Sequence, residues 1–441
     1  MRKLTFSGGI HPDDTKSLTA HLPIEEIAPP ELLYLPAQQH IGAPPEIIVN
    51  VGDSVRLGQP LTKSDAFVFA PLASSVSGTV KDIGLYLHPN GTKVPTIVIE
   101  NDGLDTPAEP LNTKTLDELS PKEIIGLVRE AGLVGMGGAG FPTHVKLSPP
   151  PEKVVTDIII NGAECEPYLT SDHRLMLEHA ADVILGAQAV MKVFSLDTAT
   201  IAIEENKPDA IAAISEEAEK VSGIRVAVLK KKYPQGAEKQ LIYAITGRQV
   251  PSGGLPADIG CVVLNVGTTA EIAQVITNGT PLYRRVVTVS GNAVKEPKNQ
   301  LLRIGTPFSY AFSQSGGLTE PPSKIIMGGP MMGIATCSQD VPVVKGTSGI
   351  LALSEVEAPW RNESACLRCG RCTTVCPLGL VPSALTAYAK LKDLEQCEKY
   401  HIMDCMECGS CSYVCPAQRH MIQSIRWAKS ELQKKRAAMK K

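Results

Sequence analysis

Two four-cysteine runs near the C-terminus constrain this 441-residue chain more than any other feature. Each run has the spacing Cys-x2-Cys-x2-Cys-x3-Cys-Pro, and the runs occupy residues 366–377 and 405–416. In such a run, three cysteines bind one [4Fe–4S] cluster and the fourth binds the other cluster. Disulfides do not need two copies of this run, and zinc sites rarely have its third spacer and Cys-Pro. We therefore expect two clusters, the first held by Cys366, Cys369, Cys372 and Cys415, the second by Cys376, Cys405, Cys408 and Cys411.

The composition indicates a folded chain of roughly three domains. Hydrophobic residues make up 43% of the chain, whereas the net charge of −3 and an aromatic content of 4% give no sign of a nucleic-acid partner. The N-terminus lacks the apolar core of a signal peptide, and no apolar run approaches the length of a membrane span, so we expect no transmembrane segment. The four remaining cysteines are scattered without a pairing pattern, as is typical of a reducing compartment; they are Cys165, Cys261, Cys337 and Cys397.

Residues 1–110 form the first predicted unit. Residues 1–45 are rich in proline and favour an extended segment packed over other domains. Residues 46–100 alternate apolar and polar side chains between Gly and Asp turns, which predicts a small antiparallel sandwich. The phrases VGDSVRLGQPL and APLASSVSGTV resemble the barrel-sandwich domain of lipoyl and biotinyl carriers. The stretch at the carriers' hairpin tip is 63–67 here, and its tip has no lysine, so we expect a docking or scaffold domain.

Residues 120–282 alternate between helical and strand patterns, which predicts a mostly parallel sheet with helices on its faces. We expect helices at 121–132, 172–194, 207–223, 236–247 and 269–279, and strands at 154–161, 199–204, 224–229 and 261–266. The overall fold class is thus a multidomain α/β protein with a Rossmann-like nucleotide-binding domain at its centre.

The C-terminal third divides into three predicted parts. Residues 283–340 return to strand patterns, with 300–312 as one strand, and resemble the β-grasp (SLBB-like) module that accompanies flavin subunits. Residues 358–425 form an α-helical domain of ferredoxin type for the two clusters, with a helix at 384–402 in which Cys397 packs. The tail 426–441 carries seven Lys and Arg against one Glu. Such a tail is usually a solvated end; the alternative is docking to an acidic partner or to lipid headgroups.

Four polar loops of the α/β region indicate one composite site. The glycines of 132–146 allow the backbone to approach a phosphate or a planar ring. Residues 161–174 follow a buried strand, at the edge where open α/β sheets bind ligands, although acidic residues there are equally typical of a helix N-terminus. Residues 230–241 and 264–271 also follow strands. Four such loops at successive strand ends favour a nucleotide-type cofactor over four independent helix caps.

These loops resemble, in order, the flavin- and NADH-binding subunit of respiratory NADH dehydrogenase. The shared motifs are GGAGFPT with a lysine three residues later, Asn-x-x-Glu-x-Glu-Pro, Tyr-x-x-Gly-x-Glu and Asn-Val-x-Thr; Ala163, Ala237 and Leu264 depart from that family's pattern. The resemblance implies FMN contacts from Gly137, Gly138, Gly140, Lys146, Asn161, Glu164, Asn265 and Thr268. It implies NADH contacts from Phe141, Lys146, Glu166, Tyr233 and Glu238.

Over its full length the chain resembles the family of C subunits of the Rnf electron-transport complex. The resemblance rests on FSGGIHP, QHIGAPP, GMGGAGFPTHVKL, MGGPMMG and the two cysteine runs. It implies a peripheral component on the cytoplasmic face of a bacterial membrane, passing electrons between NAD(H), FMN and two [4Fe–4S] clusters. Partner membrane and iron–sulfur subunits would supply electrons from reduced ferredoxin and couple their flow to Na⁺ or H⁺ movement. Two alternatives are a flavin and iron–sulfur cobalamin reductase of a microcompartment and a non-enzymatic docking scaffold that carries clusters.

Overall fold

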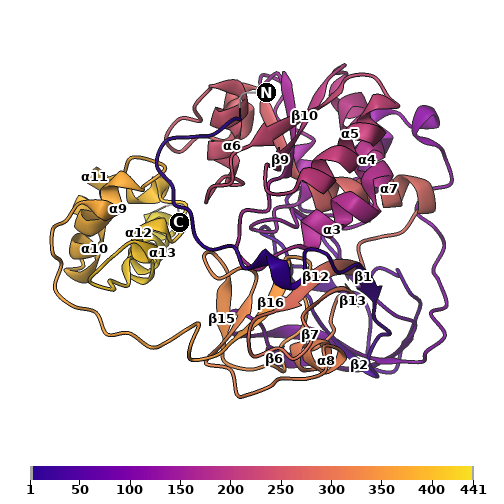
Figure 1. Cartoon of the computed structure of the whole chain (residues 1–441). Helices are drawn as coiled ribbons and strands as arrows, with labels where there is room; N and C mark the ends of the chain where they lie inside the picture. Colours follow the sequence, from indigo (N-terminus) through magenta and orange to yellow (C-terminus); the bar gives the residue numbers. More distant parts are fainter. Residues whose placement is uncertain (1–2, 440–441) are drawn as a thin grey trace.

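The computed structural model describes residues 3–439, which form four folded units joined by an extended N-terminal segment (Figure 1). The cluster domain lies at one side of the molecule in yellow, and the indigo N-terminal segment runs past it. The described residues include four short 3-10 helices, which are η1 (Lys16–Leu18), η2 (Leu116–Glu118), η3 (Pro256–Ile259) and η4 (Ile402–Asp404). None of the helices described in residues 3–439 is long and apolar enough to cross a membrane.

The N-terminal sandwich has the antiparallel arrangement that the alternating pattern predicts. One sheet has the order β2-β7-β6-β4, and a second pairs β3 with β5. The strands are β2 (Leu32–Pro36), β3 (Glu46–Ile47), β4 (Ser54–Val55), β5 (Thr62–Lys63), β6 (Gly78–Leu87) and β7 (Lys93–Asn101). The lysine-free tip docks onto the next domain, because the Phe67 carbonyl lies 2.8 Å from Nε2 of the buried His144.

The central domain is a parallel four-stranded sheet of order β10-β9-β8-β11, which confirms the predicted α/β architecture. Its strands are β8 (Asp157–Gly162), β9 (Ala199–Glu204), β10 (Ile224–Leu229) and β11 (Cys261–Asn265). Its helices are α1 (Pro121–Glu130), α2 (Thr143–Lys146), α3 (Ser171–Glu178), α4 (Ala180–Phe194), α5 (Pro208–Glu219), α6 (Glu238–Thr246) and α7 (Val266–Asn278).

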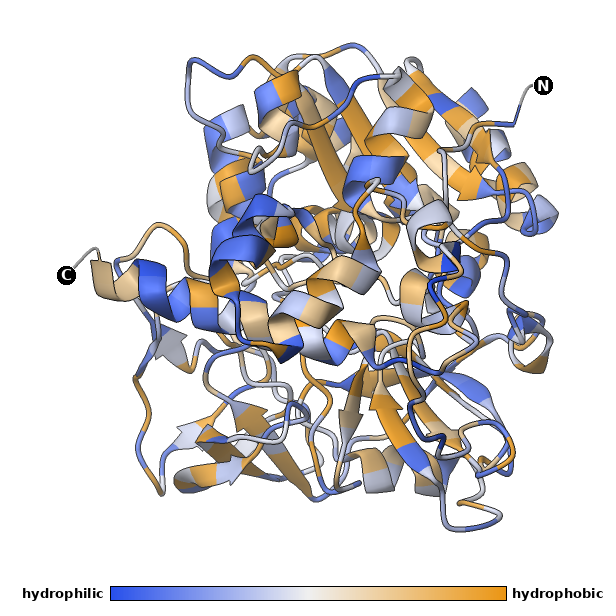
Figure 2. Cartoon of the chain, turned by 90° about the vertical axis from the view of Figure 1, so that its left-hand side faces the viewer, coloured by the Kyte–Doolittle hydropathy of each residue, from blue (hydrophilic) through white to orange (hydrophobic). Residues whose placement is uncertain are grey.

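Alternate residues of these strands pack into two separate cores. Ile158 and Ile160 pack with the α4 and α7 side, whereas Ile159 packs with Leu241 and Ile242 of α6. Because both faces of the sheet are covered, its strands are mostly apolar and appear as hydrophobic ribbons in Figure 2, although the edge strand β10 exposes Arg225.

The single helix predicted over 172–194 is wrong. His179 adopts φ −131° and ψ 36°, which ends α3 and starts α4. The break lets α3 pack against α5 and the next domain while α4 packs against α7.

The β-grasp-like unit is a six-stranded sheet of order β1-β13-β12-β16-β14-β15. Its strands are β1 (Ile24–Glu26), β12 (Arg284–Ser290), β13 (Lys298–Arg303), β14 (Lys324–Met327), β15 (Ile334–Thr336) and β16 (Gly349–Leu353). The sheet therefore extends beyond residue 340 and includes a strand from the N-terminal segment. The strand predicted over 300–312 is wrong after Arg303, because α8 (Phe308–Gln314) begins beyond Pro307 and buries Phe308, Ala311 and Phe312 at helical spacing.

The cluster domain is helical, and its two cysteine runs share one backbone conformation. Arg368 and Glu407, at matching positions, have φ of 52° and 62°. Gly370 and Gly409 have φ of 76° and 79° and precede two short helices. The helices are α9 (Arg371–Thr374), α10 (Pro382–Lys390), α11 (Leu394–Lys399), α12 (Ser410–Tyr413) and α13 (Met421–Met439). The same left-handed turn therefore recurs around each set of three cysteines.

The helix predicted over 384–402 is wrong as a single element. Lys392 has φ 60°, and the Asp393 side chain accepts the Gln396 backbone N–H at 3.1 Å, so the chain restarts as α11. Cys397 is fully buried in an apolar cluster with Leu385 and Ile425, which confirms that it packs. The predicted basic tail forms the end of α13, apart from residues 440–441, which lie outside the described residues.

The N-terminal segment is extended and packs over the other units, as its proline content predicts. Leu4 bridges to the end of β10, and Ile10 bridges to Tyr233. The Gly9 N–H donates to the Val375 carbonyl at 2.8 Å. Gly8 lies so close to the cluster domain that an added Cβ would be 2.9 Å from the Cys376 carbonyl oxygen. The segment thus fills the joint between the central domain and the cluster domain.

Candidate functional site

Three of the four predicted loops follow the carboxyl ends of β8, β10 and β11, and the glycine loop 132–146, which follows α1 and not a strand, packs against the same edge of the sheet. The Lys146 ammonium donates to Glu238 Oε1 at 2.7 Å and to the Val263 carbonyl at 3.1 Å. Asn161 Nδ2 donates to the Gly236 carbonyl at 2.8 Å. The first and second loops therefore each contact the third loop, as a composite site requires.

The glycine loop lies over the N-terminus of α7. Asn265 caps this helix, since its Oδ1 accepts the Gly267 N–H at 2.9 Å, and its Nδ2 donates to Asp172 at 2.7 Å. An added Cβ on Gly137 would lie 2.7 Å from Asn265 Nδ2, whereas one on Gly138 would meet no atom within 4 Å. Gly137 therefore packs against the helix cap, and Gly138 borders open space that a planar or anionic group can occupy.

Two further residues hold this loop in place. The buried Thr268 hydroxyl accepts the Met136 N–H at 3.0 Å and lies 3.3 Å from the Val134 carbonyl. Gly140 has φ 68°, and its carbonyl accepts the Ile41 N–H from the sandwich domain. The FMN contacts inferred for Thr268 and Gly140 stay predictions, because in this structure Thr268 joins the loop to α7 and Gly140 joins it to the sandwich.

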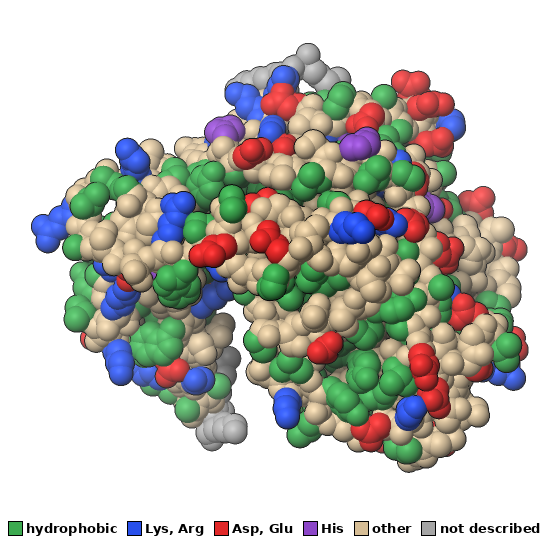
Figure 3. All heavy atoms as spheres, turned by 60° about the horizontal axis from the view of Figure 1, so that its bottom comes forward, with side chains coloured by type: hydrophobic (Ala, Val, Ile, Leu, Met, Phe, Trp, Pro, Cys, Tyr) green, Lys and Arg blue, Asp and Glu red, His purple; other side chains and the backbone are tan. Residues whose placement is uncertain are grey.

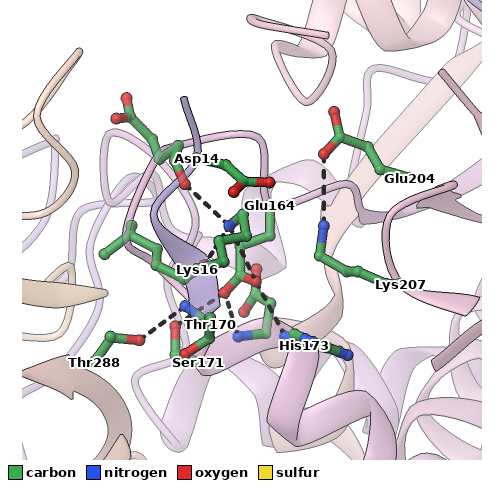
Figure 4. A network of polar contacts seen from close by, with 12 residues as sticks. Asp14, Lys16, Glu164, Thr170, Ser171, His173, Glu204, Lys207 and Thr288 are labelled. Carbon is green, nitrogen blue, oxygen red and sulfur yellow. Dashed lines mark hydrogen bonds and ion pairs between the residues drawn. The ribbon is translucent and has the colours of Figure 1, made fainter. Parts of the chain in front are cut away.

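Glu164 lies in a buried network at the strand ends (Figure 4). Its carboxylate accepts the backbone N–H groups of Asp172 at 2.7 Å and His173 at 3.3 Å, at the start of α3. Burial raises the pKa of Glu164 to about 7, opposed by the nearby Lys16 ammonium. Of the two interpretations of this loop, the structure shows the helix-capping role for Glu164, and the FMN contact stays a prediction.

Lys16 is a residue of this network that the sequence did not reveal. Its ammonium lies 3.7 Å from Glu164 and donates to the carbonyls of Glu166, at 3.0 Å, and Leu169. Lys207 supplies a second buried ammonium, 2.7 Å from the Ala163 carbonyl and 3.5 Å from Glu204. Lys16 comes from the proline-rich segment, far from the loop in sequence, and no motif marks it.

Glu166 and Tyr233 lie in a buried joint instead of an open cleft. The Glu166 carboxylate accepts the N–H groups of Met331 at 3.0 Å and Met332 at 2.9 Å, and burial raises its pKa to about 7. The Tyr233 hydroxyl donates to the Cys408 carbonyl at 2.7 Å and lies 3.4 Å from Glu166. The Gly/Met loop at 327–333 therefore binds Glu166, although its sequence alone indicated no role. NADH contacts of Glu166 and Tyr233 stay predictions.

The four cysteines of the second predicted cluster lie around one small cavity. Leu380 and Ile425 also line this cavity. Two of the cysteine sulfurs accept backbone N–H groups, from Leu380 at 3.3 Å on Cys376 and from Glu407 at 3.4 Å on Cys405. The Cys408 thiol donates to the Ser410 hydroxyl at 3.4 Å. Such an enclosed four-thiol cavity suits a [4Fe–4S] cluster.

The first predicted set is more open. Cys372 is buried and packs with Cys415 and Met421, whereas Cys366 and Cys369 are exposed. The Arg368 N–H lies 3.4 Å from Cys366 Sγ, which matches the contact at Cys405 in the other run. Among residues 3–439 no three His, Cys, Asp or Glu side chains converge on a single metal ion, so the assignment of these cysteines to two clusters stays a prediction from their spacing. All twelve cysteines are free of disulfides.

The two sets lie at different distances from the central domain. Cys408 packs with Ile10 and Tyr233, and the Pro377 carbonyl accepts a bond from Gln240 of α6 at 3.3 Å. The second set therefore faces the central domain, while Cys366 and Cys369 of the first set face solvent.

Comparison with known protein families identifies the same domains in the same order. The RnfC barrel sandwich hybrid domain matches residues 4–104, and the Nuo51 FMN-binding domain matches residues 128–274. The SLBB domain matches residues 286–335, and a 4Fe-4S dicluster domain matches residues 358–416. Fold and site thus define a flavin- and iron–sulfur-dependent electron-transfer protein.

Similar proteins specify the class further. The chain is 53% identical to the C subunit of the proton-translocating ferredoxin:NAD(+) oxidoreductase complex of Clostridium ljungdahlii, over 97% of this chain and 94% of that one. It is 48% identical to the C subunit of the Na(+)-translocating complex of Acetobacterium woodii, over 97% of each chain. The chain belongs to the family of C subunits of ion-translocating ferredoxin:NAD(+) oxidoreductase complexes, known as Rnf complexes.

Among solved structures, an NAD⁺-reducing [NiFe]-hydrogenase in the H2-reduced state has a similar fold. The superposition has a TM-score of 0.50 and 17% identity, and it covers 75% of this chain and 70% of the hydrogenase chain. At this identity the similarity concerns the fold alone.

Proposed function

We propose that this chain is the peripheral electron-transfer component of a ferredoxin:NAD⁺ oxidoreductase of the Rnf type, on the cytoplasmic face of a bacterial membrane. It passes electrons between NAD(H), FMN and two [4Fe–4S] clusters. Other membrane and iron–sulfur subunits deliver electrons from reduced ferredoxin and carry out ion translocation. The two similar proteins named above belong to complexes that move different ions, which supports assigning the choice of ion to other subunits.

The observation that carries this proposal is the position of the two cysteine sets. One set is enclosed at the joint with the central domain, where Cys408 contacts Tyr233. The other set reaches solvent at Cys366 and Cys369. Electron transfer between an external partner and an internal flavin requires one cluster near the flavin domain and one cluster near the surface, and the two cysteine sets of this domain have these positions.

The glycine loop and the strand ends would hold FMN. Gly138 offers open backbone, Asn161 and Lys146 line the edge of the sheet, and Lys146 Nζ lies 2.7 Å from Glu238 Oε1. When bound, FMN can exchange two electrons with a nicotinamide and single electrons with a cluster. The residues of the chain position and enclose this group, and no side chain has to act as a general acid or base.

An anaerobic NADH titration tests the proposal. The purified chain is reconstituted with iron, sulfide and FMN, and flavin absorbance and cluster EPR signals are followed as NADH is added. We expect NADH to bleach the flavin and then to produce the EPR signal of a reduced cluster. If NADH reduces neither centre, the assignment of residues 132–271 as a nicotinamide and flavin site is wrong.

Neither alternative is favoured by the comparisons. The match of residues 4–104 to the RnfC sandwich domain, and relatives aligned over 97% of the chain, support the Rnf assignment over a cobalamin reductase. Turnover with cob(III)alamin as acceptor at a rate above that of the ferredoxin reaction would reverse this preference. A docking scaffold without enzymatic function predicts no flavin fluorescence from denatured, reconstituted protein.

A further inference from the structure

We infer that the surface around Cys366 and Cys369 docks an acidic iron–sulfur electron carrier. This surface, which we call the entry face, consists of residues 360–371 together with Arg419 and His420. The inference rests on the proposed function, because it assigns a partner to the exposed end of the cluster domain.

The entry face combines exposed cysteines with exposed apolar side chains. Residues 364–371 are exposed at every position, and they include both cysteines. Leu367 is 66% exposed and Trp360 is 78% exposed. The Ser364 N–H donates to the Ala417 carbonyl at 3.0 Å, which holds this stretch beside the end of the second run, close to Cys415. A large aromatic side chain beside an exposed cluster ligand is typical of an anchor for a partner.

The arginines of the entry face form no ion pair within the described part of the chain, whereas its one carboxylate, Glu363, pairs with Lys390. In the cluster domain up to residue 439, Glu363, Glu395, Glu398, Glu407 and Glu431 all pair with lysines or arginines of the same domain. Within residues 3–439, no carboxylate forms an ion pair with Arg361, Arg368, Arg371 or Arg419. The entry face therefore presents a cluster of unneutralised guanidinium groups.

The net charge of the cluster domain and its tail is positive, like that of the entry face. Residues 358–441 carry 14 Lys and Arg against 7 Asp and Glu, whereas the chain as a whole has 43 against 46. The lobe at the left of Figure 3 accordingly shows mostly Lys and Arg among its charged side chains. Such a charged lobe attracts a partner of opposite sign and raises its association rate by a factor of about 10 to 1,000.

An acidic protein carrier fits this face better than an inert solvated surface. A purely solvated face needs neither the exposed Trp360, whose ring lies 6.1 Å from that of His420, nor the exposed Leu367, which follows Cys366 in the chain. Redox partners bind through small interfaces, below about 1,200 Å², in which charge supplies orientation and a few apolar groups supply contact. The entry face has this composition, since it exposes Trp360 and Leu367 together with arginines.

Stopped-flow kinetics tests the inference. The probe is a reduced, acidic 2[4Fe–4S] ferredoxin, and the readout is the second-order rate constant for reduction of the reconstituted full chain. The variants are Arg368→Glu/Arg371→Glu and Arg361→Glu, the latter five residues outside the cysteine run. The matched control is Lys122→Glu/Lys295→Glu, which makes the same change in charge at exposed positions of other domains.

We expect the arginine pair variant to react at least about tenfold more slowly at low ionic strength, and Arg361→Glu about threefold more slowly. The control should match the wild type, and all rates should converge near 1 M salt, where the Debye length is about 3 Å. Iron content and cluster potentials are measured on each variant. NADH titration of the same samples reports on the proposed function separately, because it requires no external carrier.

Three outcomes would overturn the inference. Rates equal to those of the control would show that the arginines do not steer a partner. Slower rates that persist at high salt together with shifted cluster potentials would make the arginines tuning groups for the cluster. Loss of binding to anionic phospholipid vesicles, with unchanged ferredoxin rates, would make the face a membrane contact.

Discussion

Replacement of Lys16 by methionine should destabilise the loop at the end of β8. The Lys16 side chain is 7% exposed, and that of its partner Glu164 is 4% exposed. Methionine keeps the apolar stem but removes the ammonium, so the Glu164 carboxylate loses a cation 3.7 Å away and the carbonyls of Glu166 and Leu169 lose a donor. Removing one member of a buried ion pair costs about 3–5 kcal/mol, because the other charge stays buried. We expect the lower end of this range here, since two backbone N–H groups and the Lys207 ammonium still stabilise the Glu164 carboxylate.

A surface ion pair of the same N-terminal segment provides the control. Lys3 pairs with Glu205, but its side chain is 52% exposed. Solvent screening limits such a pair to about 0–1 kcal/mol, so Lys3→Met should have little effect. Comparison of the two variants separates loss of a buried charge from loss of any lysine in this segment.

Hydrogen exchange of the peptide 160–172 provides the assay, with urea unfolding at pH 7 as a global check. We expect Lys16→Met to lower the free energy of opening of this peptide by at least about 3 kcal/mol. We also expect weaker FMN binding, since the same loop carries Asn161 at the edge of the sheet. Equal exchange in Lys16→Met and Lys3→Met would refute the argument that Lys16 holds the flavin loop.

Three further predictions follow from single contacts. Burial raises the pKa of Glu166 from 4.5 to about 7, so its contribution to stability is complete below pH 4.5 and is lost as the pH rises through 7. Relative to Glu166→Gln, the free energy of unfolding should therefore fall by about 3 kcal/mol over this range. Urea titrations that show a constant difference between the two proteins would contradict this prediction. Gly137→Ala should lower the melting temperature of the apoprotein, because the added Cβ would lie 2.7 Å from the side chain of Asn265. Gly138→Ala should leave the melting temperature unchanged, because its Cβ would meet no atom within 4 Å. Equal melting temperatures of the two variants would contradict the packing of Gly137 against Asn265. Cys405→Ser should reduce the iron content from about eight to about four atoms per chain, while Cys397→Ser should leave it unchanged; iron loss in the latter would make Cys397 a ligand.

Much of the fold can be predicted because local patterns follow from burial. Strands covered on both faces must be apolar throughout, and for that reason the pattern predicts 199–204 and 224–229 to the residue. The errors occur where two neighbouring helical segments pack against different partners. Nothing local distinguishes His179 or Lys392 from helix interiors, since the breaks there depend on what each flanking helix packs against.

The candidate site is predictable in its parts but not in its arrangement. The strand-end loops can be placed together because parallel strands share one carboxyl edge. The hydrogen bonds from the Met331 and Met332 N–H groups to Glu166 could not be predicted, because every residue except proline has a backbone N–H and the sequence does not show which of them bind a carboxylate. Lys16 could not be foreseen for the related reason that its partners are mostly carbonyls about 150 residues away.

The residue pattern alone predicts the two kinds of cofactor site, namely the iron–sulfur clusters and the nucleotide site. Cysteine spacing specifies the clusters, because the ligands of one run must wrap around a single cube, and the glycine and strand-end motifs specify the nucleotide site. How the cluster domain is placed against the nucleotide-binding domain follows from the tertiary structure alone. The order of the clusters depends on contacts such as Tyr233 with Cys408, and on the N-terminal segment that fills the joint. These contacts join residues distant in the chain, and the free energy of burying them depends on the whole assembly of domains.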